Sequence, residues 1–518
     1  MRIEIGKAIP LAALRAAWRD PVSVELSGDA RRRIAAASGA IDAAIAGGGP
    51  VYGVNTGCGH LVHVRIDATE LRKLQENIVR SHAAGVGEDL GDGVVRLVIL
   101  MKVTALARGH SGVRLELVDA LAALLEHGIY PRIPAKGSAG ASGDLAPLAH
   151  LAGVLIGEGE ARIGKDSLGG EEALRRAGLK PLRLAPKEGL ALLNGTQVSA
   201  ALALSALFRA ENVLAGALVA GAMSTDAIKG SDVPFDPRIQ ETRGHRGQIM
   251  VAGVLRDLIR GSEIRASHLD CDRVQDPYSI RCQPQVMGAC LDNLRHAASL
   301  LETEANAVTD NPLVFPDSGE VLSGGNFHAE PVAFAADILA LAIAEIGSLS
   351  ERRTALLVDP HLSRLPAFLV HDSGLNSGFM MAGITAAALT SENKGLAHPA
   401  SVDSIPTSAN QEDHVSMATH GARRLHDMLD NLEHIVAIEL LAAVQGIEFH
   451  RPARSSGALE ETIAAVRGIS PPYTEDRSLA RDISGVAALI AAGGFRDYAA
   501  AVLVSSGAGS GSPGSTGG

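Results

Sequence analysis

The sequence has little cysteine, few aromatic residues and no excess of positive charge. Its four cysteines, without a C-x-x-C pair, are too sparse for a disulfide scaffold in a chain of 518 residues. Lysine and arginine number 47 against 58 acidic residues, which gives a net charge of −11. No basic run alternates with aromatic residues in the way that nucleic-acid-binding segments do. These absences predict a cytoplasmic protein that has no nucleic acid partner.

Signals for membrane insertion are also missing. Residues 1–7 mix charged and apolar side chains, which is not the pattern of a signal peptide. The two most apolar stretches, residues 198–223 and 331–349, are interrupted by charged residues, namely Arg209, Glu211, Asp337 and Glu345. We expect both stretches to be buried helices and the protein to have no membrane partner.

The residues that are present favour helix. Alanine and leucine dominate the long segments, whereas aromatic residues make up only 3% and the alternation typical of strands is missing. Glycine and proline interrupt this pattern at residues 47–60 and 130–147, which predicts ordered loops. We therefore predict a mainly all-α fold, with a loop-rich N-terminal part over residues 1–195, a long antiparallel helical bundle over 196–504 and a flexible tail over 505–518.

Residues 137–144, which read GSAGASGD, form the most unusual loop segment. Small side chains let the backbone bend tightly, so the Gly143 amide could approach the carbonyl of Ala141 and close a five-membered ring. The plainer alternatives are a glycine-rich turn before a helix or a phosphate-binding loop. Neither the G-x-x-x-x-G-K-[ST] nor the G-x-G-x-x-G pattern is present, so composition alone favours the turn.

The longer segment 137–150, GSAGASGDLAPLAH, resembles the signature of the aromatic amino acid lyases, and the likeness extends over nearly the whole chain. The resemblance implies that Ala141, Ser142 and Gly143 form 4-methylidene-imidazol-5-one (MIO). The glycine nitrogen attacks the alanine carbonyl, and loss of two waters leaves the serine β-carbon as an electrophile. Ordinary side chains supply no such electrophile, and ammonia leaves badly without activation. The resemblance implies no metal.

Tyr52 lies in the loop YGVNTGCG, whose glycines would let a phenol lie close to a ligand. Without the family, a single tyrosine is more often a packing residue. The resemblance implies that Tyr52 is the base that takes the β-proton, for which its ordinary pKa of about 10 requires lowering or preorganisation. Cys58 stands where the family commonly has phenylalanine, which leaves the local packing open.

The resemblance also implies a binding site for the substrate carboxylate. Arg281, in QDPYSIR, has the guanidinium fork that pairs with a carboxylate, although taken alone it would be read as a surface salt bridge. Tyr278 would be a catalytic residue that orients the substrate near the electrophile, and Asn194 would support the same cluster. Gln275 and Phe327 match further positions that line the pocket.

Two residues carry the choice of substrate. His82, in SHAAG, and Glu412, in QEDHVSM, resemble the members of the family that act on histidine. A buried carboxylate can accept an imidazole N–H. A phenyl ring would leave the carboxylate unpaired, which costs on the order of several kcal/mol. Without the family, they would be a satisfied histidine and a solvated charge.

The resemblance therefore implies elimination of ammonia from L-histidine to give trans-urocanate, the first step of histidine degradation. The alternatives within the family are a tyrosine or phenylalanine ammonia-lyase and an MIO-dependent 2,3-aminomutase. The family also implies a homotetramer in which each active site draws residues from three chains. Outside the family, a metal hydrolase is disfavoured because the 18 histidines form no H-E-x-x-H motif, and a noncatalytic helical scaffold remains the other alternative.

Overall fold

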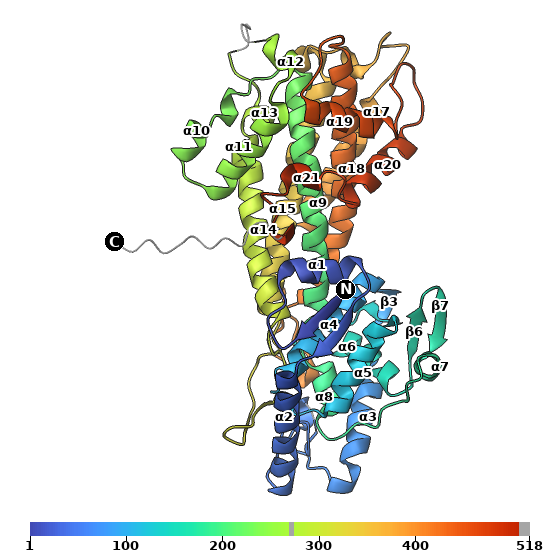
Figure 1. The fold of residues 1–518 in the computed structure, drawn as a ribbon. Helices are drawn as coiled ribbons and strands as arrows, with labels where there is room; N and C mark the ends of the chain where they lie inside the picture. The colour runs from blue at the N-terminus through green and yellow to red at the C-terminus, as the bar shows by residue number, and fades with distance from the viewer. Residues whose placement is uncertain (58, 269–273, 507–518) are drawn as a thin grey trace. The chain divides into compact units, whose positions relative to one another are not determined.

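The computed structural model describes residues 1–57, 59–268 and 274–506 and is mainly helical, which confirms the predicted fold class (Figure 1). The α-helices are α1 (Leu11–Arg19), α2 (Gly28–Ala46), α3 (Leu71–His82), α4 (Asp92–Ala107), α5 (Leu115–Glu126), α6 (Leu145–Leu155), α7 (Gly170–Arg176), α8 (Glu188–Leu193), α9 (Gln197–Ala227), α10 (Pro237–Glu241), α11 (Arg246–Ile259), α12 (Glu263–Ala266), α13 (Tyr278–Arg281), α14 (Gln283–Ala305), α15 (Glu330–Val358), α16 (Pro360–Ser363), α17 (Met380–Leu396), α18 (Ala418–Glu448), α19 (Gly457–Arg467), α20 (Ala480–Ala491) and α21 (Arg496–Ala499).

The strands are short and form small separate sheets. They are β1 (Arg2–Ile5), β2 (Ser23–Leu26), β3 (Val86–Asp89), β4 (Ile129–Pro131), β5 (Pro134–Lys136), β6 (Glu160–Ile163), β7 (Asp166–Gly169), β8 (Leu313–Phe315) and β9 (Glu320–Leu322). Strand β1 pairs with β2 in parallel, whereas β3 with β5, β4 with β6 and then β7, and β8 with β9 are antiparallel. The predicted loop over 130–147 thus contains two short strands and ends where α6 begins.

The chain divides into two compact units, each assembled from distant segments. Unit 1 comprises residues 1–205, 298–337 and 399–423, and unit 2 comprises 206–297, 338–398 and 424–518. The predicted parts, residues 1–195 and 196–504, are continuous in sequence, whereas each observed unit combines three segments that are far apart in the chain. We describe the two units separately.

Unit 1 is built around α4, which is buried along almost its whole length. Its sequence is mostly apolar, with Arg96 and Lys102 as buried exceptions, and it packs against α1, α2 and α5. Helices α3, α6 and α8 pack against one another in the same unit. Their ends matter most below, because α3 ends at His82, α6 follows the segment 137–144 and α8 is followed by Asn194.

Unit 2 contains a buried ion pair between Arg353 and Glu439, both fully shielded from solvent. The Glu439 carboxylate also accepts hydrogen bonds from the hydroxyls of Ser224 and Ser350. The guanidinium and the carboxylate compensate each other's charge, so removing either residue of the ion pair would leave an unpaired charge inside the unit. These contacts connect α9, α15 and α18 within unit 2.

Two helices, Gln197–Ala227 and Glu330–Val358, are long and apolar enough to span a membrane by composition alone. Their apolar windows are 94% and 67% buried inside the protein, so they are core helices, as predicted for residues 198–223 and 331–349.

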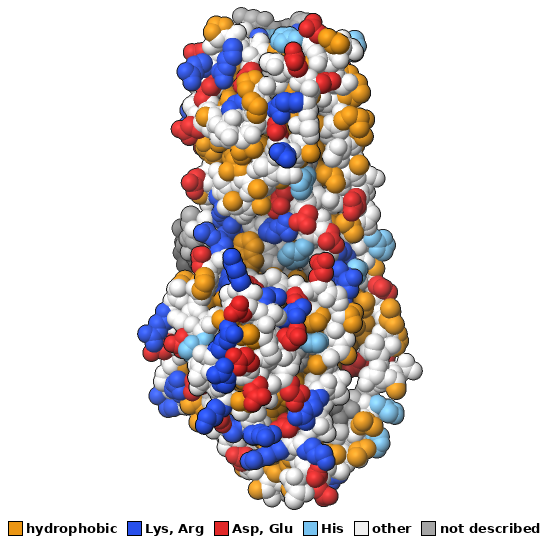
Figure 2. Space-filling model, turned by 90° about the vertical axis from the view of Figure 1, so that its right-hand side faces the viewer, with side chains coloured by type: hydrophobic (Ala, Val, Ile, Leu, Met, Phe, Trp, Pro, Cys, Tyr) orange, Lys and Arg blue, Asp and Glu red, His pale blue; other side chains and the backbone are white. Residues whose placement is uncertain are grey.

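On the face shown in Figure 2, acidic and basic side chains are interspersed rather than separated by sign. Of the predicted tail, Val504–Ser506 form a short 3-10 helix, and residues 507–518 lie outside the described part, as does Cys58.

Candidate functional site

The segment predicted to form an electrophile lies in a tightly constrained loop between β5 and α6. Gly143 has φ +75° and forms a parallel bridge with Gly195, and a Cβ added to Gly143 would collide with the Gly195 carbonyl. Gly140 has φ +66°, and a Cβ there would collide with the Ser416 hydroxyl. Glycine is therefore required at both positions, on either side of Ala141 and Ser142.

Asp144 fixes the end of this loop from within the core. Its carboxylate is fully buried and accepts hydrogen bonds from the backbone N–H groups of Val198 and Ser199 at 3.0 and 2.7 Å, in the first turn of α9. The hydroxyls of Ser138 and Thr419 donate to the same carboxylate. A carboxylate that accepts this many hydrogen bonds at a helix N-terminus holds the loop in place.

Asn194 connects the end of α8 to the loop. Its side-chain amide Nδ2 donates to the carbonyl oxygen of Ser142 at 3.0 Å. Its Oδ1 is shielded from solvent and accepts no hydrogen bond from the described residues. A buried acceptor without a donor costs free energy, which indicates that Oδ1 is held ready for a ligand.

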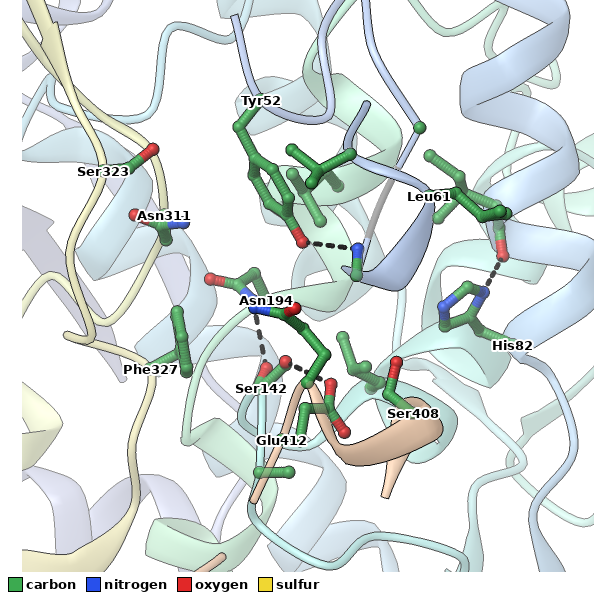
Figure 3. A pocket seen from close by; sticks show the side chains of 18 of the residues that line it. Tyr52, Leu61, His82, Ser142, Asn194, Asn311, Ser323, Phe327, Ser408 and Glu412 are labelled. Atoms are coloured by element: carbon green, nitrogen blue, oxygen red, sulfur yellow. Dashed lines mark hydrogen bonds between the residues drawn. The ribbon is translucent and has the colours of Figure 1, made fainter. Parts of the chain in front are cut away.

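A cavity of about 1210 Å³ in unit 1 opens above this loop (Figure 3). Six residues predicted to form the site line it, namely Tyr52, His82, Ser142, Asn194, Phe327 and Glu412. Figure 3 shows the hydroxyl of Ser142 directed toward Glu412 and the carbonyl of Ser142 directed toward Asn194. Residues that are far apart in the sequence are thus brought to one cavity around Ser142.

The phenol of Tyr52 reaches into the cavity with its oxygen already engaged. The backbone N–H of Gly59 donates to the Tyr52 hydroxyl oxygen at 2.9 Å (Figure 3). An N–H aimed at a phenol oxygen stabilises the phenolate more than the neutral phenol, because the anion is the stronger acceptor. The sequence analysis did not foresee this contact, because a backbone amide carries no residue signature.

Glu412 accepts two hydrogen bonds, one on each carboxylate oxygen. Ser142 Oγ donates to Oε1 at 2.8 Å and Thr407 Oγ1 donates to Oε2 at 2.5 Å. Backbone hydrogen bonds also close the turn between Thr407 and Glu412, and three of the four residues inside it, Ser408–Asn410, have positive φ. Such a turn is strained for residues other than glycine, and strain of this kind is found where a side chain is held for function.

The ring orientation of His82 is also set locally. Its Nδ1 lies 2.8 Å from the carbonyl oxygen of Ile78, one turn earlier in α3. A carbonyl oxygen only accepts, so Nδ1 carries the proton in this contact and Nε2 is left as an acceptor in the neutral ring. Such a group can accept an N–H from a ligand in the cavity.

Phe327 precedes a small polar cluster at the same cavity. Donor atoms of His328, Glu330 and His414 lie within 4.8 Å of one another, a set of side-chain types that can bind zinc. His328 Nε2 lies 3.2 Å from the His414 carbonyl oxygen, so this contact leaves Nδ1 as the ring nitrogen of His328 that could bind a metal. The prediction of no metal stays a prediction.

Gln275, Tyr278 and Arg281 belong to unit 2, so they are not among the residues of unit 1 that line this cavity. Within unit 2 the Arg281 guanidinium lies 4.5 Å from the centre of the Tyr278 ring. Tyr278 is 71% exposed, and the buried Nε of Arg281 has no hydrogen-bond partner in the described residues. The Tyr278 ring is thus exposed, whereas the Arg281 Nε is buried without a described partner.

Thr407 does not line the cavity but holds Glu412, and the sequence analysis missed it. Its hydroxyl fixes one oxygen of Glu412, yet a threonine five residues before a glutamate matches no motif. The only signal was the small, polar composition of residues 404–411, which predicts a turn but does not identify the hydroxyl that points inward.

Comparison with known proteins gives one consistent result. The aromatic amino acid lyase family matches residues 9–468. The chain is 60% identical to a histidine ammonia-lyase of Paracidovorax citrulli (strain AAC00-1), over 92% of this chain and 93% of that protein. Among solved structures, it matches histidine ammonia-lyase from Trypanosoma cruzi with 43% identity and a TM-score of 0.89, covering 97% of this chain and 96% of the other. It matches tyrosine aminomutase from Streptomyces globisporus with 35% identity and a TM-score of 0.91, covering 96% and 98%.

Proposed function

The chain belongs to the aromatic amino acid lyase family, and from this premise we infer that it is an ammonia-lyase that converts L-histidine to trans-urocanate and ammonia. The structural observation that carries the choice of histidine is the position of Glu412, whose carboxylate lies in the same cavity as Ser142 at hydrogen-bond distance. A carboxylate at this place suits an imidazole N–H and disfavours an apolar ring. We place the reaction in the cytoplasm, as the first step of histidine degradation.

The residues around Ser142 fit the MIO group that the family uses, and we propose that Ala141, Ser142 and Gly143 form it. Gly143 leaves room where a Cβ would collide, and Asn194 already holds the carbonyl that would belong to the ring. When formed, the group supplies an electrophilic carbon that activates the substrate amine for departure. Loss of the Ser142 hydroxyl would also free Oε1 of Glu412 for the substrate.

Side chains of unit 1 stabilise charge, remove the β-proton and bind the imidazole ring. Asn194 donates to the Ser142 carbonyl, which stabilises negative charge that develops on that oxygen. Tyr52 removes the β-proton of the substrate, with the Gly59 amide supporting the phenolate. Glu412 and His82 Nε2 bind the imidazole, and Phe327 lines the pocket beside it.

The substrate carboxylate is bound by Arg281, with Tyr278 and Gln275 beside it. We propose that these residues come from neighbouring chains of a homotetramer. The exposed Tyr278 ring and the unsatisfied Arg281 Nε support this arrangement, because one chain alone leaves the phenol open to solvent and the Nε without a partner among the described residues. Unit 2 also exposes apolar side chains on α15 and α17, including Leu341, Met381 and Ile384, as subunit interfaces do.

Shared sites predict that two inactive variants restore each other. Ser142→Ala and Arg281→Ala should each be inactive as homotetramers, yet their one-to-one coexpression should recover about a quarter of the wild-type activity, the random chance that a site takes both native residues from different chains. Purified mixed tetramers, assayed for ammonia release, provide the measurement. Activity at the background level of the single variants would contradict sites shared in this way, as would a fully active species with the 53.5 kDa mass of one chain.

A change of Glu412 is expected to alter specificity rather than activity in general. Glu412→Ala should lower kcat/KM for L-histidine by about 10² or more, because a charge-assisted contact is lost and the β-carbon is misplaced. Trace activity on L-phenylalanine should be unchanged or raised, since the apolar ring no longer faces an unpaired carboxylate. Arg281→Ala should instead damage both substrates alike.

Kinetics of both variants on both amino acids measure this difference. Because Glu412 also contacts Ser142, rates are divided by the fraction of chains that have lost two waters, read from intact mass. Glu412→Gln, which keeps an acceptor without the charge, is the matched control and should fall between the wild type and Glu412→Ala. Unchanged histidine turnover in Glu412→Ala would remove the main support for the histidine assignment and leave a tyrosine or phenylalanine lyase or a 2,3-aminomutase.

A further inference from the structure

A lysine that the proposed reaction does not use lies buried beneath the cavity. Lys102 belongs to the central helix α4, and its side chain is almost completely shielded from solvent. Its ammonium donates to the backbone carbonyls of Ala191 at 3.2 Å and Asn194 at 2.6 Å. Both carbonyls lie at the C-terminal end of α8, where backbone carbonyls have no hydrogen-bond partner within the helix. A cation is favourable at this end of a helix.

The surroundings of Lys102 disfavour its charged form, as its lowered pKa indicates. Burial lowers the pKa of Lys102 to about 7, although the carboxylates of Asp310 and Asp144 oppose the change. The nearby ammonium of Lys187 acts in the same direction as burial, and it forms its own ion pair with Asp310 at 2.7 Å. Burying an ammonium costs free energy that an apolar residue of similar size would not cost at this position. The presence of a lysine here therefore indicates a function.

We propose that Lys102 is a positioning residue for the electrophile, because its ammonium fixes the backbone of Asn194 and thereby aligns the Asn194 amide on the Ser142 carbonyl. The inference rests on the proposed function, since the Ser142 carbonyl matters only if the MIO group forms there. Lys102 is not among the residues that line the cavity and makes no described contact with Ser142, so it acts through Asn194.

Each link in this chain of contacts is short and buried. Lys102 Nζ holds the Asn194 carbonyl oxygen, and Asn194 Nδ2 holds the Ser142 carbonyl oxygen at 3.0 Å. The next residue, Gly195, accepts the backbone N–H of Asp144 at 2.7 Å, so residues 194–195 fix the loop on both sides of Gly143. A donor that stabilises the Ser142 carbonyl also makes the adjacent Cα–H of Ser142 more acidic, and loss of this proton with the Ser142 hydroxyl, as water, leaves the double bond.

The contact should depend on pH near neutrality. Below about pH 7 the Lys102 amine is charged and its hydrogen bonds to the two carbonyls are charge-assisted; above that pH it is neutral and the bonds weaken. The charged groups that face it are Asp310, Asp144 and Lys187. The benefit from Lys102 is therefore full at low pH and declines as pH rises through its pKa.

The test compares Lys102→Met with Thr104→Val, a matched control on the same helix whose buried hydroxyl bonds only to the Leu100 carbonyl among the contacts described. Intact mass gives the fraction of chains lighter by two waters, about 36 Da by ring-closure stoichiometry. Ammonia release gives kcat and KM per matured chain from pH 5.5 to 9. The ratio of wild-type to variant kcat removes the pH dependence of Tyr52, which both proteins share.

For Lys102→Met we expect a lower matured fraction, a kcat reduced about tenfold or more and a KM changed less than about threefold. The kcat ratio should be largest near pH 6 and fall above about pH 7, whereas Thr104→Val should match the wild type throughout. A folded Lys102→Met with wild-type mass loss and a flat ratio would overturn the proposal. If Lys102→Met does not fold, Lys102→Arg decides, because its guanidinium keeps its charge and must abolish the decline above pH 7. A wild-type chain that neither loses two waters nor acts on histidine would instead refute the proposed function.

Discussion

Replacing Ser142 by alanine is expected to abolish ammonia release from L-histidine, by a factor of about 10⁴ or more, while the chain still folds. The variant keeps a Cβ of the same kind but has no oxygen to eliminate, so the electrophilic carbon cannot arise. Ser142 is only half-buried, and the one hydrogen bond described for its hydroxyl, to Glu412, is given up by the mature wild type as well when the hydroxyl leaves. Relative to a chain that has not matured, loss of a hydrogen bond to a carboxylate costs about 1.5–3 kcal/mol.

Intact mass and thermal unfolding together measure this outcome. The wild-type chain should be lighter than its sequence by two waters and Ser142→Ala should not, while the two unfold at similar temperatures. Ser138→Ala is the matched control in the same loop, because it removes a hydroxyl that bonds to Asp144 but leaves Ser142 in place. It should retain the mass loss. An unmodified mass in a fully active wild-type preparation would refute the mechanism.

Tyr52→Phe is expected to lower kcat for L-histidine by about 10³, within the range typical of a lost general base. The change removes one oxygen and leaves the ring to fill the same space, so substrate binding should change little. The structure adds a reason for a large effect, because the variant has no phenolate oxygen to accept the hydrogen bond from the Gly59 amide. Formation of the MIO group should be unaffected.

Steady-state kinetics and exchange of the substrate β-proton with solvent deuterium check this prediction. Tyr130→Phe is a suitable control, since Tyr130 is also in unit 1 but is buried beside Arg96, away from the cavity lining. It should keep both turnover and exchange. Turnover by Tyr52→Phe within tenfold of the wild type would assign the proton transfer to another group.

The helical fold could be predicted because alanine and leucine decide local structure over long segments, and the interruption at 130–147 because proline and glycine act locally. The cavity residues came from resemblance, and the cavity lining includes six of them. Physical reasoning from single residues would not have found them, since Phe327 and His82 alone look like packing residues.

The contacts that orient these residues could not be predicted, because they depend on backbone atoms and on segments far apart in the chain. Lys102 looks like any lysine in a helix, and only the fold places it under the end of α8. The Gly59 amide and the Thr407 hydroxyl likewise have no sequence signature. Gln275, Tyr278 and Arg281 belong to unit 2, and their roles in the site stay predictions.

The assembly of unit 1 from three separate segments also sets the order of events during synthesis. Glu412 is 270 residues further along the chain than the serine that it contacts. A ribosome adds roughly 5–20 residues each second, so tens of seconds pass between the appearance of the two partners. For that time the nascent chain carries Ala141, Ser142 and Gly143 without the wall that completes their cavity. Activity therefore cannot appear before the last segment of unit 1, residues 399–423, has been synthesised.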